Sequence, residues 1–215
     1  MHPAHIKSRR KREVAQPLLF RQPVNAHALA IVMQRVARAM APFYRAIAGC
    51  QLYAKRWSEA VIDADLKTME QLLRRVSPAA ARQGLATNGI GYFVSFAAPS
   101  PIDHYTNGVT IPPGKVQFVF EPRAHRLLAR HVLPFYETLA QHSPFSVRLA
   151  QAIQRHDIGA VHRLVRARIR TAHLRVIAIE DEGLILTFVF PFSRFRYQNV
   201  LFRDVLETDG DGRQE

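Results

Sequence analysis

The sequence predicts an α+β fold built from an internally duplicated unit, in which each half has about three helices followed by an antiparallel hairpin or three-stranded meander. The segment "APFY" at 41–44 returns as "LPFY" at 133–136, and the same offset of 92 residues aligns the two halves without a gap. Other identical pairs follow this register: Asp65 with Asp157, Gly91 with Gly183, Tyr105 with Tyr197 and Asn107 with Asn199. Helical patterns precede strand patterns in both halves, so we expect a pseudo-two-fold relation between them.

The same register divides the chain into four parts. We expect residues 1–17 to be a basic flexible arm and residues 207–215 to be an acidic disordered tail. The first α+β repeat is assigned to 18–114 and the second to 115–206. With 48% apolar residues among 215, the chain is long enough for one sizeable core or two small ones.

Hydrophobic periodicity predicts the helices of each half. The apolar residues of the first helix recur at steps of three and four: Leu29, Val32, Val36 and Met40. This helix is expected to begin after the cap Asn25 and to run toward Pro42. The remaining helices are expected in the same order in both halves, in 51–62 and 65–76, and then in 123–141, 143–155 and 157–169.

The strands are expected to follow the helices. In 84–99, the Asn88-Gly89 pair favours a tight hairpin, because both central residues of such a turn adopt positive φ. The corresponding turn of the second half is expected at 180–183. Third strands are expected at 105–111 and 197–202, and additional strands at 17–23 and 115–122.

Two of these strands predict how the halves pack. Residues 92–96 and 184–190 are apolar at nearly every position, which is typical of strands that are buried on both faces. We therefore expect the helices to cover one face of the sheet and the other half to cover the opposite face.

The chain has no pattern that predicts a membrane span or a secretion signal. Its longest apolar runs, such as "LILTFVFPF", are too short to cross a bilayer, and the basic N-terminus is not followed by an apolar signal segment. One cysteine, Cys50, cannot form an internal disulfide, which is typical of a reducing compartment. We therefore expect a cytoplasmic protein without a membrane partner, with Cys50 as a small buried residue.

Few residues predict catalysis. Asp65 and Asp157 can be read as paired carboxylates, but each precedes a helical pattern, so helix capping is the favoured interpretation. Asp103 and His104 are the only candidate catalytic dyad; the second half has Phe195 and Arg196 at these positions, and no nucleophile motif is present. A turn with a surface histidine is favoured.

Metal and cofactor sites are not predicted. The histidines, including His125, His131, His156 and His162, lack the spacings typical of zinc sites. We therefore assign no metal ligand and no cofactor.

The strongest functional signal is positive charge, with a formal net charge of +13 and a pI near 10.8. The candidate nucleic-acid contacts fall in three segments. The arm contributes Lys7, Arg9, Arg10, Lys11 and Arg12, a helical stripe contributes Arg163, Arg166 and Arg170, and a strand contributes Arg194, Arg196 and Tyr197. Arginines interleaved with aromatic residues are compatible with stacking on single-stranded nucleic acid. The alternative for the strand is an edge protected by outward charges.

The blocks "LFRQPV", "NGIGYFVSF" and "TNGVTIPPGKVQF" are similar to an uncharacterised protein group of endospore-forming bacilli. The similarity spans most of the chain. It implies a bacterial, sporulation-linked, cytoplasmic setting and supplies no catalytic residue or ligand.

Three functions from different classes follow from these observations. The first is a non-enzymatic basic protein that binds a polyanion, DNA or RNA, through its basic faces. The second is a structural or assembly protein that self-associates through the duplicated unit. The third is an enzyme with a site between the halves, for which Asp103 and His104 are the dyad to test. Charge favours the first, although no known nucleic-acid motif is present.

Overall fold

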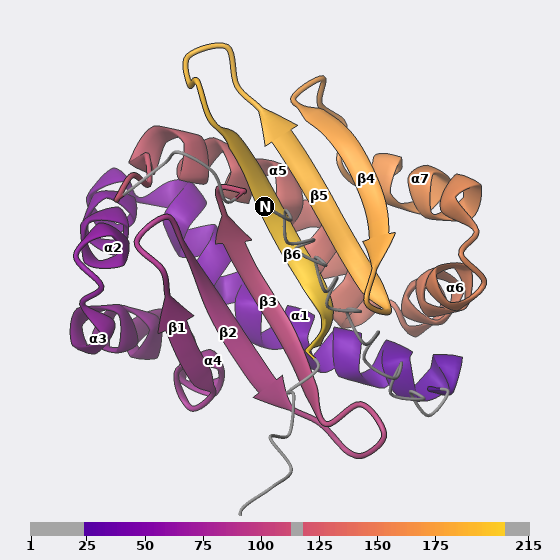
Figure 1. Ribbon diagram of the computed structural model, residues 1–215. Coiled ribbons are helices and arrows are strands. Elements are labelled where there is room, and N and C mark those ends of the chain that lie inside the picture. The colour runs from indigo at the N-terminus through magenta and orange to yellow at the C-terminus, as the bar shows by residue number, and fades with distance from the viewer. Residues whose placement is uncertain (1–23, 113–117, 205–215) are drawn as a thin grey trace, which may run out of the picture.

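The computed structural model describes residues 24–112 and 118–204, and its helices lie behind one continuous sheet (Figure 1). The fold is α+β, as predicted. The helices of the described residues are α1 (Ala26–Gly49), α2 (Gln51–Ile62), α3 (Leu66–Val76), α4 (Pro78–Ala81), α5 (Pro122–Gln141), α6 (Ser143–Gln154) and α7 (Ile158–Arg166). The strands are β1 (Gly84–Thr87), β2 (Gly91–Ala97), β3 (His104–Thr110), β4 (Leu174–Glu180), β5 (Gly183–Val189) and β6 (Arg196–Asp204).

The six strands form an antiparallel sheet in the order β1-β2-β3-β6-β5-β4. β3 and β6 pair at its centre, with His104 opposite Asp204 and Thr110 opposite Gln198. The two sets of three strands therefore meet edge to edge and share one sheet. This corrects the expectation that the second half covers the opposite face, because the halves associate through backbone hydrogen bonds rather than face to face.

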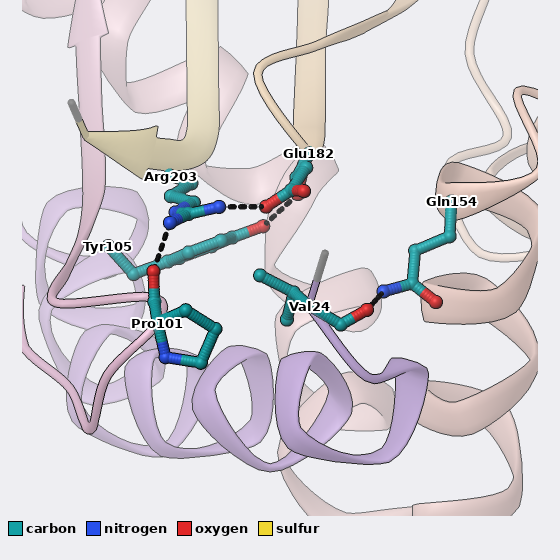
Figure 2. Close-up of polar contacts among 6 residues, drawn as sticks. All are labelled: Val24, Pro101, Tyr105, Gln154, Glu182 and Arg203. Carbon is teal, nitrogen blue, oxygen red and sulfur yellow. Dashed lines mark hydrogen bonds and ion pairs between the residues drawn. The ribbon is translucent and has the colours of Figure 1, made fainter. Parts of the chain in front are cut away.

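The long helices α1 and α5 pack together behind the sheet, with α2 and α3 to one side of them and α6 and α7 to the other (Figure 1). The predicted apolar face of α1 is buried: Leu29, Val32, Val36 and Met40. Asn25 caps the helix as predicted, since its side chain accepts a hydrogen bond from the His27 backbone N–H at 2.7 Å. The start of α1 is also tied to α6, because Gln154 donates to the Val24 carbonyl (Figure 2).

The expectation that α1 ends near Pro42 is wrong. The helix continues through this proline to Gly49. A proline inside a helix removes one backbone hydrogen bond, but the residues beyond it, Phe43, Tyr44 and Ile47, are fully buried. Burial of these large side chains offsets the lost hydrogen bond. α5 contains Pro134 at the matching place.

Both predicted hairpins are present. β1 and β2 are joined by Asn88, Gly89 and Ile90, and β4 and β5 are joined by Asp181 and Glu182. The first loop has three residues, whereas a turn with two central residues was expected. Of Asn88 and Gly89, only Gly89 has a positive φ (76°). The Asn88 side chain instead accepts from the Ile90 backbone N–H at 3.2 Å, an arrangement typical of an Asx turn.

Two further expectations differ from the structure. The described part of the strand expected at 115–122 is not a strand, since 118–121 are irregular and Pro122 begins α5. A fourth helix, α4, follows α3 because Ser77 begins a new turn: its hydroxyl accepts from the Ala80 backbone N–H and donates to the Ala39 carbonyl. The strand expected at 17–23, the basic arm and the acidic tail lie outside the described residues.

Several matched elements of the two halves are 92 residues apart. α2 and α6 differ by 92 at both ends, as do β2 and β5. The turn between α2 and α3 and the turn between α6 and α7 each contain a residue with positive φ, Ala64 at 53° and His156 at 51°. The next residues, Asp65 and Asp157, cap α3 and α7 by accepting from backbone N–H groups at 3.0 and 2.9 Å. The capping interpretation of both aspartates is therefore confirmed.

Candidate anion-binding pocket

A cavity with a volume of about 420 Å³ lies between α6 and α7. Its distinguishing feature is a set of four arginines, Arg148, Arg155, Arg163 and Arg168. We call this cavity the arginine pocket. Its wall also contains apolar side chains, among them Phe145 and Leu164. Positive charge over an apolar wall suits an anionic ligand that also has a less polar part.

Local structure explains why these arginines converge. Arg148 lies on α6 and Arg155 is the C-cap of the same helix, two turns later and therefore on the same side. Arg163 projects from α7, whose opposite face is held in the core by Val161 and Val165. Arg168 follows α7, and its guanidinium carbon lies 5.7 Å from the centre of the Phe145 ring.

The positive charge of the arginine pocket is not neutralised within the described residues. There, the guanidinium groups of Arg148, Arg155 and Arg163 take part in no ion pair or hydrogen bond. Asp157 is the only carboxylate among the described residues that line the pocket, and its Oδ1 accepts from the Ala160 backbone N–H. Like charges held close together repel one another, so an anion that binds among them gains Coulomb energy.

The predicted stripe Arg163, Arg166 and Arg170 is only partly correct. Arg163 lines the arginine pocket, but α7 ends at Arg166, so Arg170 lies beyond the helix. Arg166 is held by the chain itself, since its guanidinium donates to the carbonyls of Thr171 at 3.0 Å and Leu174 at 2.7 Å. These hydrogen bonds occupy donors that the stripe would offer to phosphates.

Sequence reasoning missed Arg148, Arg155 and Arg168. A signal for two of them was present, because Arg148, Gln151 and Arg155 recur at steps of three and four and so share one face of α6. Arg168 has no such signal, since it reaches the pocket from the turn after α7.

The strand expected to stack on nucleic-acid bases does not offer Tyr197 for that role. Tyr197 is fully buried, and its hydroxyl accepts from the Glu121 backbone N–H at 3.0 Å. Burial raises the pKa of this hydroxyl above its ordinary value. Arg194 and Arg196 are exposed, but β6 is paired on both sides, so its interpretation as an edge strand is also wrong.

The candidate dyad Asp103 and His104 is not assembled. Asp103 is exposed with a φ of 62°, and no hydrogen bond joins it to His104 within the described residues. His104 begins β3, and its Nδ1 is buried without a hydrogen-bond partner in that part of the chain. Neither residue therefore orients the other for proton transfer.

The neighbouring loop is instead fixed by a partly buried ion pair (Figure 2). Arg203 on β6 binds Glu182 at 3.0 Å and also donates to the Pro101 carbonyl. Tyr105 donates to the Glu182 carbonyl at 3.0 Å. These contacts join the loop before β3 to the turn between β4 and β5, so they have a structural role.

Four matched polar residues form a closed ring of hydrogen bonds in the core. Tyr44 donates to Asn107 at 2.8 Å and Tyr136 donates to Asn199 at 2.9 Å. Asn107 donates to Tyr136 at 2.6 Å, and Asn199 donates to Tyr44 at 2.8 Å. Burial raises the pKa of both tyrosines well above its ordinary value. Because each hydroxyl donates and accepts within the ring, the ring stabilises the interface between the halves.

Other classes of site receive no support from the described residues. None of their helices has the length and apolar character needed to cross a membrane. They contain no cluster of three or more potential metal ligands. Cys50, expected to be buried, is exposed, and its sulfur accepts from the Tyr53 backbone N–H at the start of α2.

Comparison of the chain with known protein families, with curated proteins and with solved structures found no match.

Proposed function

We propose that this protein binds a polyanion, DNA or RNA, without catalysing a reaction, and that the arginine pocket is a contact site for its phosphates. The observation that carries the proposal is the pocket's four arginines against one carboxylate. The net charge of +13 supports it, because a basic protein attracts nucleic acid over a longer range than any single contact.

The kind of basic residue favours phosphate as the recognised group. The chain has 30 basic residues, of which five are lysines, so that 25 are arginines. The planar guanidinium binds phosphate oxygens through two parallel hydrogen bonds, whereas lysine acts as a point charge. A concave site with four guanidinium groups can therefore surround a phosphate from several directions.

The test is a titration of labelled single-stranded and duplex oligonucleotides with the full chain at a series of salt concentrations. We expect affinity to fall steeply with salt, because each neutralised phosphate releases condensed counterions. Arg148→Gln should reduce the salt slope by about one phosphate equivalent.

Arg56→Gln is the matched control, because Arg56 is exposed, precedes Arg148 by 92 residues and lies outside the arginine pocket. Its salt slope should stay close to that of the unaltered protein. If neither form of nucleic acid binds at low salt, or if the two variants have equal slopes, the proposed function is wrong.

We further propose that the chain arose by internal duplication and that its halves are related by an approximate two-fold axis between β3 and β6. The mirrored strand order and the 92-residue offset of the matched elements support this. The polar ring supports it independently, because each tyrosine donates to the asparagine of its own half and accepts from the other. Determination of the structure by crystallography, followed by superposition of the halves, tests this proposal.

A further inference from the structure

A second basic cavity lies against α1 and α4, in the half of the chain that does not contain α7. It has a volume of about 370 Å³ and is lined by Arg35 and Arg38 of α1 and by Arg82, which follows α4. We call it the α1–α4 groove. No carboxylate is present among the described residues that line it. It differs in this respect from the arginine pocket, where Asp157 is present.

The chain itself orients two of the three arginines of the groove. Arg35 Nη1 donates to the Ala97 carbonyl at 2.9 Å, and Arg38 Nε donates to the Ala140 carbonyl at 3.0 Å. A guanidinium has five N–H donors, so each retains donors for a ligand. The Arg82 guanidinium takes part in no hydrogen bond or ion pair within the described residues. The groove therefore combines preorganised donors with uncompensated charge.

Two of the three arginines of the groove have no basic counterpart in the second half, whereas Arg38 corresponds to Arg130. Residues 92 positions after Arg35 and Arg82 are Leu127 and Leu174. The α1–α4 groove and the arginine pocket thus lie in different halves and are built from unrelated positions. Each half has its own concentration of arginine at its own place.

We propose that the α1–α4 groove is a second phosphate-binding site and that one nucleic-acid strand occupies it together with the arginine pocket. The inference rests on the proposed function and adds the kind of ligand: a polymer long enough to reach both sites, rather than a small phosphorylated molecule. Once one site is filled, the second contact is intramolecular and forms at a high effective concentration.

The fold offers a direct connection between the two sites. Arg38 of the groove donates to the carbonyl of Ala140, which lies in the last turn of α5. Gln34, on the same helix, donates to Ser143 at the first residue of α6 at 3.2 Å. α6 then carries Arg148 and leads to Arg155, both in the arginine pocket. A strand that follows this surface meets arginine at both ends of its path.

The experiment compares the double variant Arg35→Gln with Arg82→Gln against a control of equal charge, Arg56→Gln with Arg175→Gln. Both control arginines are exposed and lie outside the two cavities. The probes are inorganic phosphate, a single strand of about four nucleotides and one of about 30, which brackets the usual footprint of a single-strand-binding domain. Circular dichroism and thermal unfolding verify that each variant is folded.

We expect the unaltered protein to bind the long strand at least about tenfold more tightly than the short one, because the long strand engages both sites. The groove variant should lose most of this gain and should reduce the salt slope for the long strand by about two phosphate contacts. The control variant should keep the gain.

Two outcomes overturn the inference while the proposed function stands. In the first, the long strand binds and responds to changes in the arginine pocket, but the groove variant behaves like the control. In the second, the long and the short strand bind with the same affinity, and inorganic phosphate at low concentration displaces both equally well. If no strand binds the unaltered protein at low salt, the proposed function itself has failed.

Discussion

The α6–α7 pair and the α2–α3 pair have the same backbone design and different charges. Their C-caps, Arg155 and Asp63, have φ of −82° and ψ of 0°, and aspartates cap both following helices. At the positions that line the arginine pocket, however, the first half has Glu59 where the second has Gln151. Three of the four pocket arginines also change: Arg155 corresponds to Asp63, Arg163 to Gln71 and Arg168 to Val76.

The difference separates what the fold requires from what a ligand requires. The N-caps of α3 and α7 are aspartates in both helix pairs and the buried positions are mainly apolar in both, because these residues determine where the helices begin and how they pack. The pocket residues that differ between the halves, such as Gln151, Arg155 and Arg163, are exposed, so their substitution has little effect on stability. Charge that accumulates at such positions in one half only is not required by the fold, and the proposed binding function would account for it.

The largest expected effect comes from giving one helix pair the charges of the other. Arg155→Asp with Arg163→Gln makes the α6–α7 pair resemble the α2–α3 pair, and we expect single-strand affinity at low salt to fall by about tenfold to a hundredfold, the value of one or two charged hydrogen bonds. The reverse change, Asp63→Arg with Gln71→Arg, should raise affinity. Fluorescence anisotropy titration measures both. Equal affinities of the unaltered protein and the two double variants would mean that the charge difference between the helix pairs has no role in binding.

The polar ring provides a comparison in which the two halves should agree. Tyr44→Phe and Tyr136→Phe each delete a hydroxyl that donates to one asparagine and accepts from the other. Each leaves a buried amide oxygen without that donor, which costs about 1 to 3 kcal/mol of unfolding free energy. Urea denaturation should give similar losses for both variants. A large loss for one and none for the other would contradict the proposed two-fold relation.

The aromatic core contains a polar pair that has no counterpart under the 92-residue offset. Tyr92 and His125 are fully buried and hydrogen-bonded at 3.0 Å, whereas the matching positions are Leu184 and Met33. Burial lowers the pKa of His125 to about 3. The imidazole is therefore neutral in the folded state over a pH range in which the unfolded chain takes up a proton.

This pair predicts that acid destabilises the protein. Above the ordinary histidine pKa of about 6.5 neither state binds the proton, and stability is at its full value. As the pH falls from there toward 3, protonation favours the unfolded state, and His125 should cost about 2 kcal/mol by pH 5. Urea denaturation of the unaltered protein and of Tyr92→Leu with His125→Met measures this loss. If the double variant shows the same acid dependence, His125 is not its source.

The sequence predicted the elements well because local rules govern them. Periodicity placed α1, the aspartates predicted their caps, and Gly89 indicated the first hairpin. How the halves join was predicted wrongly, because an apolar strand in the centre of one sheet has the same pattern as a strand between two layers. Only the pairing of β3 with β6 distinguishes these arrangements.

The candidate site was predicted less well because it depends on side chains from separate elements. Arg163 was identified from helical spacing, whereas Arg168 joins it only through the turn after α7. Arg166 fits the same spacing, but backbone carbonyls beyond the helix hold it. Sequence spacing shows which residues share a face of a helix, and it does not show which of them are already bound by the chain.

The smallest expected effect concerns the two capping aspartates, which have equal structural roles in unequal surroundings. Asp157→Ala removes the cap of α7 and should lower the unfolding free energy by about 1 kcal/mol. It also removes the carboxylate of the arginine pocket, so we expect nucleic-acid affinity to rise about twofold to fivefold at low salt, as loss of a weak charge repulsion does. Asp65→Ala removes the matching cap of α3 and should destabilise the protein in the same direction without changing affinity. Thermal unfolding and anisotropy titration of both variants separate the two roles. A gain in affinity for Asp65→Ala as large as that for Asp157→Ala would mean that net charge alone, and not the arginine pocket, determines binding.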